Sequence, residues 1–270
     1  MEKLNRFTAR HQGSCRIIMV ILWILWALLV MDLGFPKVLT YILMAVGIFV
    51  FSIAISISGD RLLKKPLEIL NQQCDPYPLL QETTEQLGYR GTEAVKQVRN
   101  INYAMALRHI GEYSRAEMLL RSINIDKYAL APITKVVYYN NLMDICVLTG
   151  NLQEARIWYE KTVRIFSDIK DGKQKKALAR TVAQNRAWYC FAGGEYEQAL
   201  QTMEMNRPEN LLQQIEAAML CGCIYLEMGR RDQAEQALQF AAHNGNKLYA
   251  AQKARNMLEE MTKTQENGVT

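Results

Sequence analysis

A short phrase that recurs four times constrains the fold of this chain more than any other feature. The phrase begins with glycine and ends five residues later with alanine, and its copies start at Gly111, Gly150, Gly194 and Gly229. Each copy lies between two apolar runs of helical periodicity. The copies are separated by 39, 44 and 35 residues, and recurrence on this scale is typical of repeat proteins. The sequence therefore predicts a stack of four similar helical units.

Each copy predicts two helices joined by a tight turn. Glycine suits the end of the first helix because it adopts left-handed dihedral angles without a side-chain clash. Alanine suits the second helix because a small side chain lets two helices cross closely. About twelve residues before each alanine a further position is expected to make the matching contact, and these positions hold Ala104, Met143, Ala187 and Gly222, of which methionine fits poorly.

These residues resemble the tetratricopeptide repeat family over residues 91–264. The family pattern has a small residue and a large one on the first helix, glycine before the turn, an aromatic residue after it and a small residue on the second helix. The positions that carry the resemblance are packing positions: Ala104, Gly111, Ala116, Gly150, Ala155, Ala187, Gly194, Ala199, Gly222, Gly229 and Ala234. The spacings exceed the family's repeat of about 34 residues, so we expect a longer loop at 171–176.

The resemblance implies a groove that binds a partner peptide. In such arrays the first helices of the repeats line the concave face. The positions that map to this face are Met105, Arg108, Asn140, Asp144, Gln184, Trp188, Cys223 and Glu227. Trp188 is the expected anchor because aromatic side chains dominate recognition energies, with filling of the superhelix interior as the alternative. The Lys and Asn set that grips a partner's terminal carboxylate in some family members is incomplete here.

The N-terminal region, residues 1–59, predicts a transmembrane hairpin. Two runs nearly free of charge, at about 16–35 and 38–58, approach or reach the roughly 20 residues that a membrane helix needs. Gly34 and Pro36 mark a turn between them. Basic residues flank the pair on both sides, which favours cytoplasmic N and C termini. A cleaved signal peptide and a buried hairpin are the alternatives, and both fit less well because no cleavage site or matching apolar face follows.

The remaining segments complete an all-α architecture. Residues 60–90 predict connector helices, the second ending at Gly88. After the fourth repeat, residues 247–262 predict a capping helix, which an open array needs at its end. Residues 265–270 predict a disordered tail. The expected fold is thus two transmembrane helices, an α-solenoid of about four helix pairs, and a cap.

Charge and cysteine content exclude several classes of function. The formal charge is +5, but residues 1–59 hold five of the 32 basic and only two of the 27 acidic side chains. The repeat region is therefore close to neutral, which argues against nucleic-acid binding. Six cysteines without a paired CxxC pattern suit a reducing compartment. Cys221 and Cys223 fit a helix interior better than a metal site. No motif for catalysis, a cofactor or a small-molecule substrate is found.

The sequence therefore predicts a scaffold without enzymatic activity. We expect a protein integral to the membrane of a bacterial cell, with a lipid bilayer around its hairpin and a protein or peptide partner in its groove. The alternative is a membrane-integral subunit of a larger complex, in which the hairpin drives assembly and the repeats are structural.

Overall fold

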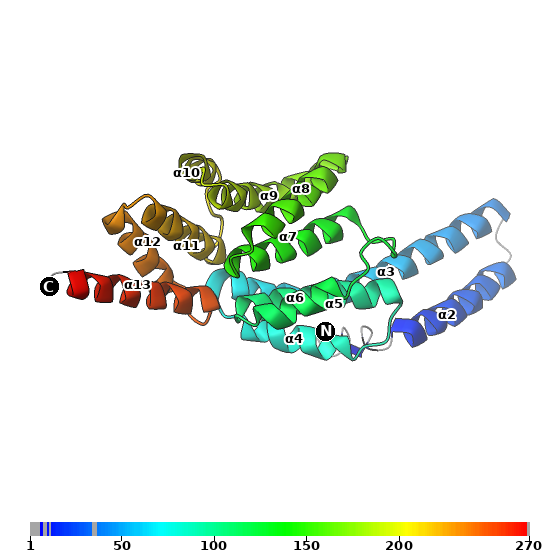
Figure 1. The fold of residues 1–270 in the computed structure, drawn as a ribbon. Coiled ribbons are helices and arrows are strands. Elements are labelled where there is room, and N and C mark those ends of the chain that lie inside the picture. Colours follow the sequence, from blue (N-terminus) through cyan, green and yellow to red (C-terminus); the bar gives the residue numbers. More distant parts are fainter. Residues whose placement is uncertain (1–5, 8–9, 11, 34–36, 269–270) are drawn as a thin grey trace.

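The computed structural model describes residues 6–7, 10, 12–33 and 37–268, and these residues form helices and connecting turns without any strand. The chain begins with a helical hairpin of α2 (Gln12–Asp32) and α3 (Lys37–Gln73), followed by α4 (Tyr77–Leu87) (Figure 1). Within the hairpin, the ring of Trp26 lies so close to Gly47 that a Cβ atom added there would be 2.8 Å from it. The glycine therefore lets the two helices approach. The expected turn at residues 34–36 lies outside the described residues.

The predicted membrane spans are corrected by the structure. No helix in the described part of the chain is both long enough and apolar enough to cross a membrane. In addition, the predicted span 38–58 does not end there: α3 continues as one helix through the charged residues Asp60, Arg61 and Lys64 to Gln73. This finding contradicts the predicted integral-membrane localisation and its two-span topology. Apolar side chains of α2 such as Leu25 and Met31 lie exposed on the hairpin surface.

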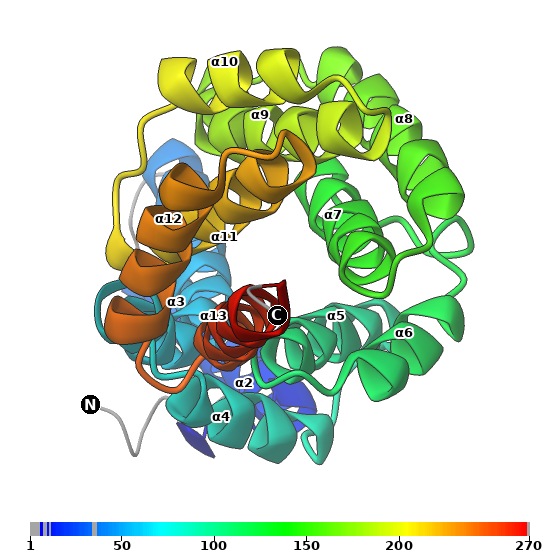
Figure 2. The same ribbon diagram turned by 60° about the vertical axis from the view of Figure 1, so that its left-hand side comes forward.

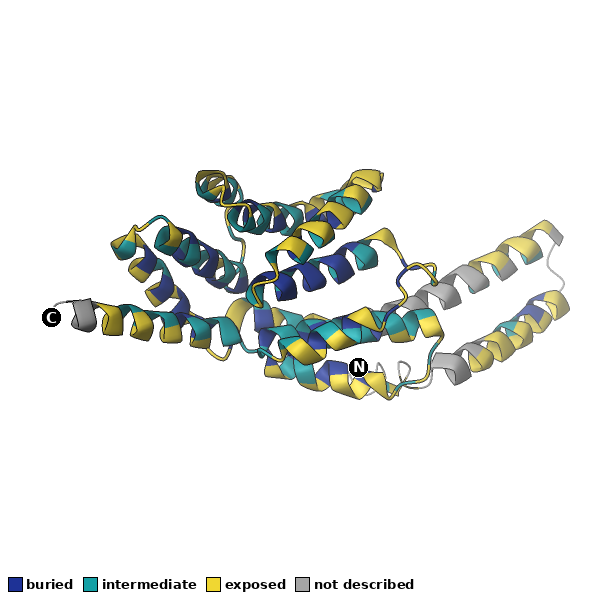
Figure 3. Cartoon of the chain, viewed as in Figure 1, coloured by how far each residue is buried: buried dark blue, intermediate teal, exposed yellow. Residues whose placement is uncertain are grey.

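Four helix pairs follow, and their arrangement is consistent with an α-solenoid. The first helices form an inner layer and the second helices an outer one (Figure 2). The inner helices are α5 (Glu93–His109), α7 (Pro132–Leu148), α9 (Gly172–Ala192) and α11 (Leu211–Glu227). The outer helices are α6 (Tyr113–Arg121), α8 (Leu152–Asp168), α10 (Tyr196–Met205) and α12 (Arg231–Asn244). Burial is densest on inner helices such as α7 (Figure 3).

The repeated glycines and alanines occupy special positions in every pair. The glycines lie between the two helices with φ of 87°, 82°, 78° and 72° at Gly111, Gly150, Gly194 and Gly229. An L-residue with a side chain is strained at such angles. The alanines of the second helices, Ala116, Ala155, Ala199 and Ala234, are at most 1% exposed. The smallest crossing residue is Gly222, where a Cβ atom would lie 2.7 Å from Leu238.

The segment 171–176 begins a helix instead of forming the expected loop. The side chain of Asp171 accepts hydrogen bonds from the backbone N–H groups of Lys173 and Gln174, at 2.8 and 3.2 Å. An aspartate that satisfies these free donors stabilises a helix start. The longer spacing between the second and third copies is taken up by the 21 residues of α9.

The two ends of the array meet, so the helices enclose a ring. Asn246 donates to the backbone oxygen of Gln73 at 2.8 Å, and Lys247 pairs with Asp75 at 2.7 Å. The last helix, α13 (Tyr249–Gly268), packs mainly on α12 and α11, and in Figure 1 it projects away from the helix pairs toward the C terminus. It includes residues 265–268, where a disordered tail is predicted, and residues 269–270 lie outside the described part. Helix α13 therefore packs on the last repeat, and only its start reaches the inside of the ring.

Candidate functional site

The inner helices bring most of the predicted groove residues to one cavity. Five of the eight predicted positions line it, namely Arg108 of α5, Asp144 of α7, Gln184 and Trp188 of α9, and Cys223 of α11. Of the other three, Asn140 hydrogen-bonds to Asp144, Met105 packs on the core cluster beside it, and Glu227 is exposed at the end of α11. Residues from four repeats thus converge on a single site.

Helix α13 closes one side of this cavity. Ala250 and Lys253 of this helix contribute to its wall, together with Leu248 just before the helix. The ring of Tyr249 stands edge-on against Tyr113 with 5.4 Å between centroids, which fixes the start of α13 on the first repeat. The enclosed space is about 60 Å³. At about 10–15 Å³ for each water-sized group, this is room for about four to six such groups. The cavity is partly open, so a single side chain of a longer segment could enter this space.

A network of ion pairs joins three inner helices at the cavity. Arg108 Nη1 lies 2.9 Å from Asp144 Oδ2, and Arg108 Nη2 lies 3.5 Å from Glu216 Oε1. All three side chains are at most 20% exposed. Gln184 donates to Glu216 Oε2 at 3.1 Å and Asn140 to Asp144 Oδ2 at 3.2 Å. A single guanidinium thus serves two carboxylates, so the network carries one excess negative charge when both are ionised.

Burial shifts the pKa values of this network. The pKa of Asp144 is raised to about 6, because burial disfavours its charged form more than the attraction of Arg108 favours it; Glu216 adds a smaller repulsion, and the hydrogen bond from Asn140 lowers the pKa. Burial lowers the pKa of Arg108, but the attraction of Asp144 and Glu216 outweighs it and the net pKa is raised. Burial and the neighbouring Arg108 hold the pKa of His109 well below 6.5. His109 is therefore neutral, and its Nε2 accepts a hydrogen bond from Arg108 at 3.1 Å.

Trp188 lies at the cavity wall and is also packed against the core, so its predicted role as an anchor stays a prediction. It lines the cavity, and it also packs edge-on against Phe191 with 5.7 Å between centroids. It is only partly buried. One part of the indole is thus held by the core while another part faces the cavity, an arrangement that presents a rigid aromatic surface to a ligand.

Several lining residues are missing from the predicted set. Glu216 and Met219 precede Cys223 by seven and four residues on α11, so all three lie on one face of the helix. This spacing is a signal that sequence reasoning could have used to find Glu216. His109 directly follows the predicted groove residue Arg108, and Tyr113 lies two residues after the repeat glycine Gly111. Lys253 could not be found in this way, since a capping helix at an open end would not reach the groove.

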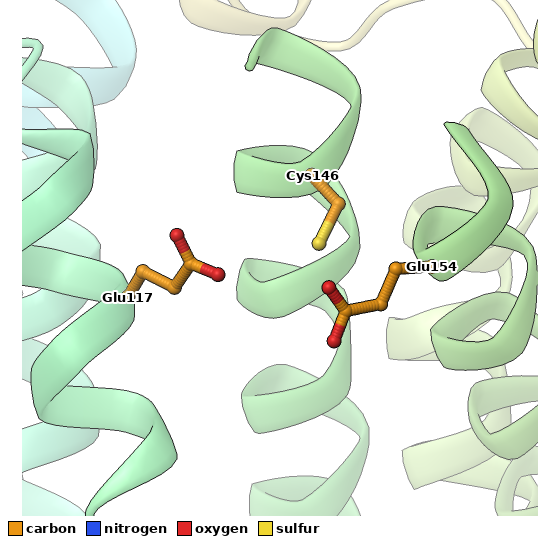
Figure 4. Close-up of side chains that lie close together, drawn as sticks. All are labelled: Glu117, Cys146 and Glu154. Carbon is orange, nitrogen blue, oxygen red and sulfur yellow. The ribbon is translucent and has the colours of Figure 1, made fainter. Parts of the chain in front are cut away.

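A second cluster lies between the outer and inner layers, away from the cavity. Glu117 of α6, Cys146 of α7 and Glu154 of α8 have their ligand atoms within 4.8 Å of one another (Figure 4). However, Arg121 already binds both carboxylates, at 2.7 and 2.6 Å. Burial raises the pKa of the Cys146 thiol to about 12, so the thiol is protonated at neutral pH. The cluster is best explained as a link between three helices.

Comparison with protein families, curated proteins and solved structures finds no match to this chain. The resemblance to tetratricopeptide repeats therefore rests on the repeated residues alone and stays a prediction. What the structure adds is the helical ring, the cavity inside it and the ion-pair network at the cavity wall.

Proposed function

We propose that the protein is a helical-repeat scaffold that binds a segment of a protein partner at the cavity inside its ring. The observation that carries this proposal is the convergence of Arg108, Asp144, Gln184, Trp188 and Cys223 from four helices on one partly enclosed space. A ligand site typically combines apolar walls with a few fixed polar groups. Here the apolar part comes from residues such as Trp188, Leu212 and Met219.

The chemistry of the cavity supports binding over catalysis. Burial raises the pKa of the Cys223 thiol, whereas a nucleophilic cysteine needs a lowered pKa. His109 is neutral, buried, and engaged with Arg108. Neither group has the properties of an activated nucleophile or base. The second hypothesis from the sequence, a membrane-integral subunit assembled through residues 1–59, loses its premise with the corrected spans.

Capture of the partner tests this proposal. The protein is used as bait in an extract of its source cells, with chemical cross-linking and identification of the captured proteins. Trp188→Ala removes the aromatic wall, and Asp144→Ala removes the carboxylate. We expect both variants to lose most of the captured partner, since truncating a buried anchor costs about 2 kcal/mol or more in binding free energy.

The matched control is Phe240→Ala, which removes an exposed aromatic residue from the outer helix α12. This variant should recover the partner as well as the unmodified protein does. Equal recovery with all three variants would rule out the cavity as the binding site, provided that circular dichroism shows the same helix content in each.

A further inference from the structure

We propose that the cavity receives a lysine side chain of the partner, with its ammonium group at Asp144 and Glu216 and its methylene stem against Trp188. This inference rests on the proposed function and specifies the chemistry that the site recognises. It differs from recognition of a terminal carboxylate, because Asp144 offers an acceptor oxygen to a cation, although the wall also holds the unpaired donor Arg108 Nε.

An unused acceptor oxygen in the network is the first argument. Asp144 Oδ2 receives both Arg108 and Asn140, whereas no hydrogen bond to Oδ1 is found among the described residues. Glu216 is held by Gln184 and by a long contact of 3.5 Å to Arg108. Asp144 thus keeps an acceptor oxygen for a further donor. Because the surroundings are poorly hydrated, an added cation gains more here than at an open surface.

The size and the walls of the cavity are the second argument. Its room for about four to six water-sized groups is similar to the number of non-hydrogen atoms in a lysine side chain beyond Cα. The stem of lysine is apolar and suits contact with Trp188 and Met219, while a cation beside an indole face is further stabilised. The guanidinium of arginine is broader and is already represented in the wall by Arg108.

The wall contributed by α13 already holds a lysine. Lys253 lines the same cavity, and its charge offsets part of the burial effect that raises the pKa of Cys223. Among the described residues, the ion pairs of Asp144 and Glu216 are with Arg108 and not with Lys253. The ammonium group of Lys253 repels a cation that enters the cavity. Removing this charge should strengthen lysine binding.

The pKa of Asp144 is raised chiefly by burial, which Arg108 and Asn140 only partly offset. A bound ammonium group would favour the ionised form, so lysine binding should weaken as the pH falls through 6. The titratable and charged groups packed around Asp144 are Arg108 and His109 of α5, Tyr113 of α6, Glu216 of α11, and Tyr249 and Lys253 of α13. His109, with its pKa well below 6.5, stays neutral through the upper part of this range.

Titration with defined peptides tests the inference. The probe is a blocked pentapeptide with a central lysine among glycines, and the indole N–H resonance of Trp188, assigned with Trp188→Phe, reports binding to the full chain. Matched probes carry acetyl-lysine or arginine at the centre. We expect the lysine peptide to shift the resonance, and the acetyl-lysine peptide to bind at least about tenfold more weakly, the loss expected for one charge-assisted hydrogen bond.

Three variants and one control complete the test. Asp144→Asn and Glu216→Gln should weaken binding of the lysine peptide, while Asp232→Asn, at an exposed site of α12, should leave it unchanged. Lys253→Met should strengthen binding, a gain that misfolding cannot produce.

The inference is overturned by equal binding of the lysine and acetyl-lysine peptides, by tighter binding of arginine than of lysine, or by no response to any probe. In each of these cases the proposed function is judged separately, from the capture experiment with Trp188→Ala and Phe240→Ala.

Discussion

At the scale of single residues, Arg108 balances the charge of two carboxylates inside the ring. Its guanidinium is the counter-ion for Asp144 and Glu216, and its side chain is 12% exposed. Arg108→Met leaves two carboxylates in a poorly hydrated site, which should lower the free energy of unfolding by about 3–5 kcal/mol. Urea denaturation followed by circular dichroism measures this change. Arg115→Met, at an arginine 57% exposed on α6, should cost less than about 1 kcal/mol.

A second change separates loss of charge balance from loss of packing. In Arg108→Met combined with Asp144→Asn, one of the two unbalanced carboxylates becomes a neutral amide. We therefore expect the double variant to be more stable than Arg108→Met alone. A double variant as unstable as the single one would show that packing of the arginine stem, rather than its charge, supports the ring.

Asp144 gives stability a pH dependence of opposite sign to that of an ordinary surface carboxylate. Its pKa rises from 3.8 to about 6 on folding, so the folded chain binds its proton more tightly than the unfolded chain does. The stabilisation from this group is complete below pH 4 and is lost as the pH rises through 6. The shift corresponds to about 3 kcal/mol at about 1.4 kcal/mol for each pH unit.

The Asp144→Asn variant measures this contribution. The difference in unfolding free energy between Asp144→Asn and the unmodified protein, determined in urea at several values between pH 4 and 7, should shift in favour of the variant as the pH rises. The comparison isolates one group because all other titrating residues are common to both proteins. A difference that stays constant over this range would contradict the assigned shift.

At the scale of elements, two of the turn glycines form a matched pair of test sites. Gly111 and Gly150 have φ of 87° and 82°, so alanine is strained at both, by about 1–2 kcal/mol. At Gly111 a Cβ atom would also lie 2.4 Å from the ring of Tyr249, whereas nothing lies within 4 Å at Gly150. Gly111→Ala should therefore destabilise the protein more than Gly150→Ala. Thermal unfolding of both variants measures the difference. Equal shifts in Tm would show that the ring of Tyr249 moves aside without lowering the stability.

The elements also show how far local sequence signals reach. The glycine-to-alanine phrase was sufficient to predict four helix pairs, because it encodes a helix end, a turn and a close crossing within a few residues. The prediction failed at 171–176, where the long spacing between copies suggested a loop although Asp171 starts a helix. Apolar runs in residues 1–59 indicated the hairpin of α2 and α3 but led to incorrect membrane spans. Of the cavity residues, those on regular repeat positions were predictable.

At the scale of the whole molecule, ring closure was beyond the reach of the sequence. It depends on contacts between residues far apart in the chain, such as Asn246 with Gln73, 173 positions away. Neither residue belongs to a motif, and the repeat pattern alone is compatible with an open array. Closure brings the start of α13 to the cavity wall, where Ala250 and Lys253 lie. Residues far apart in the chain thus share one site.

Closure also predicts how the molecule unfolds. In an open array each repeat contacts only its neighbours, so damage to the last helix loosens the last repeats alone. Here Leu248, 2% exposed, packs in one cluster with Leu70 of α3 and Leu79 of α4.

Leu248→Ala should lower the free energy of unfolding by about 2–5 kcal/mol. It should also lower amide-exchange protection in α3 and α4 as well as in α13. Leu142→Ala, a buried leucine in the cluster of the first two repeats, is the control that should leave α13 more protected than Leu248→Ala does. Native-state hydrogen exchange distinguishes the cases, since loss of protection confined to α11, α12 and α13 in Leu248→Ala would mean that the two ends of the ring are not energetically coupled.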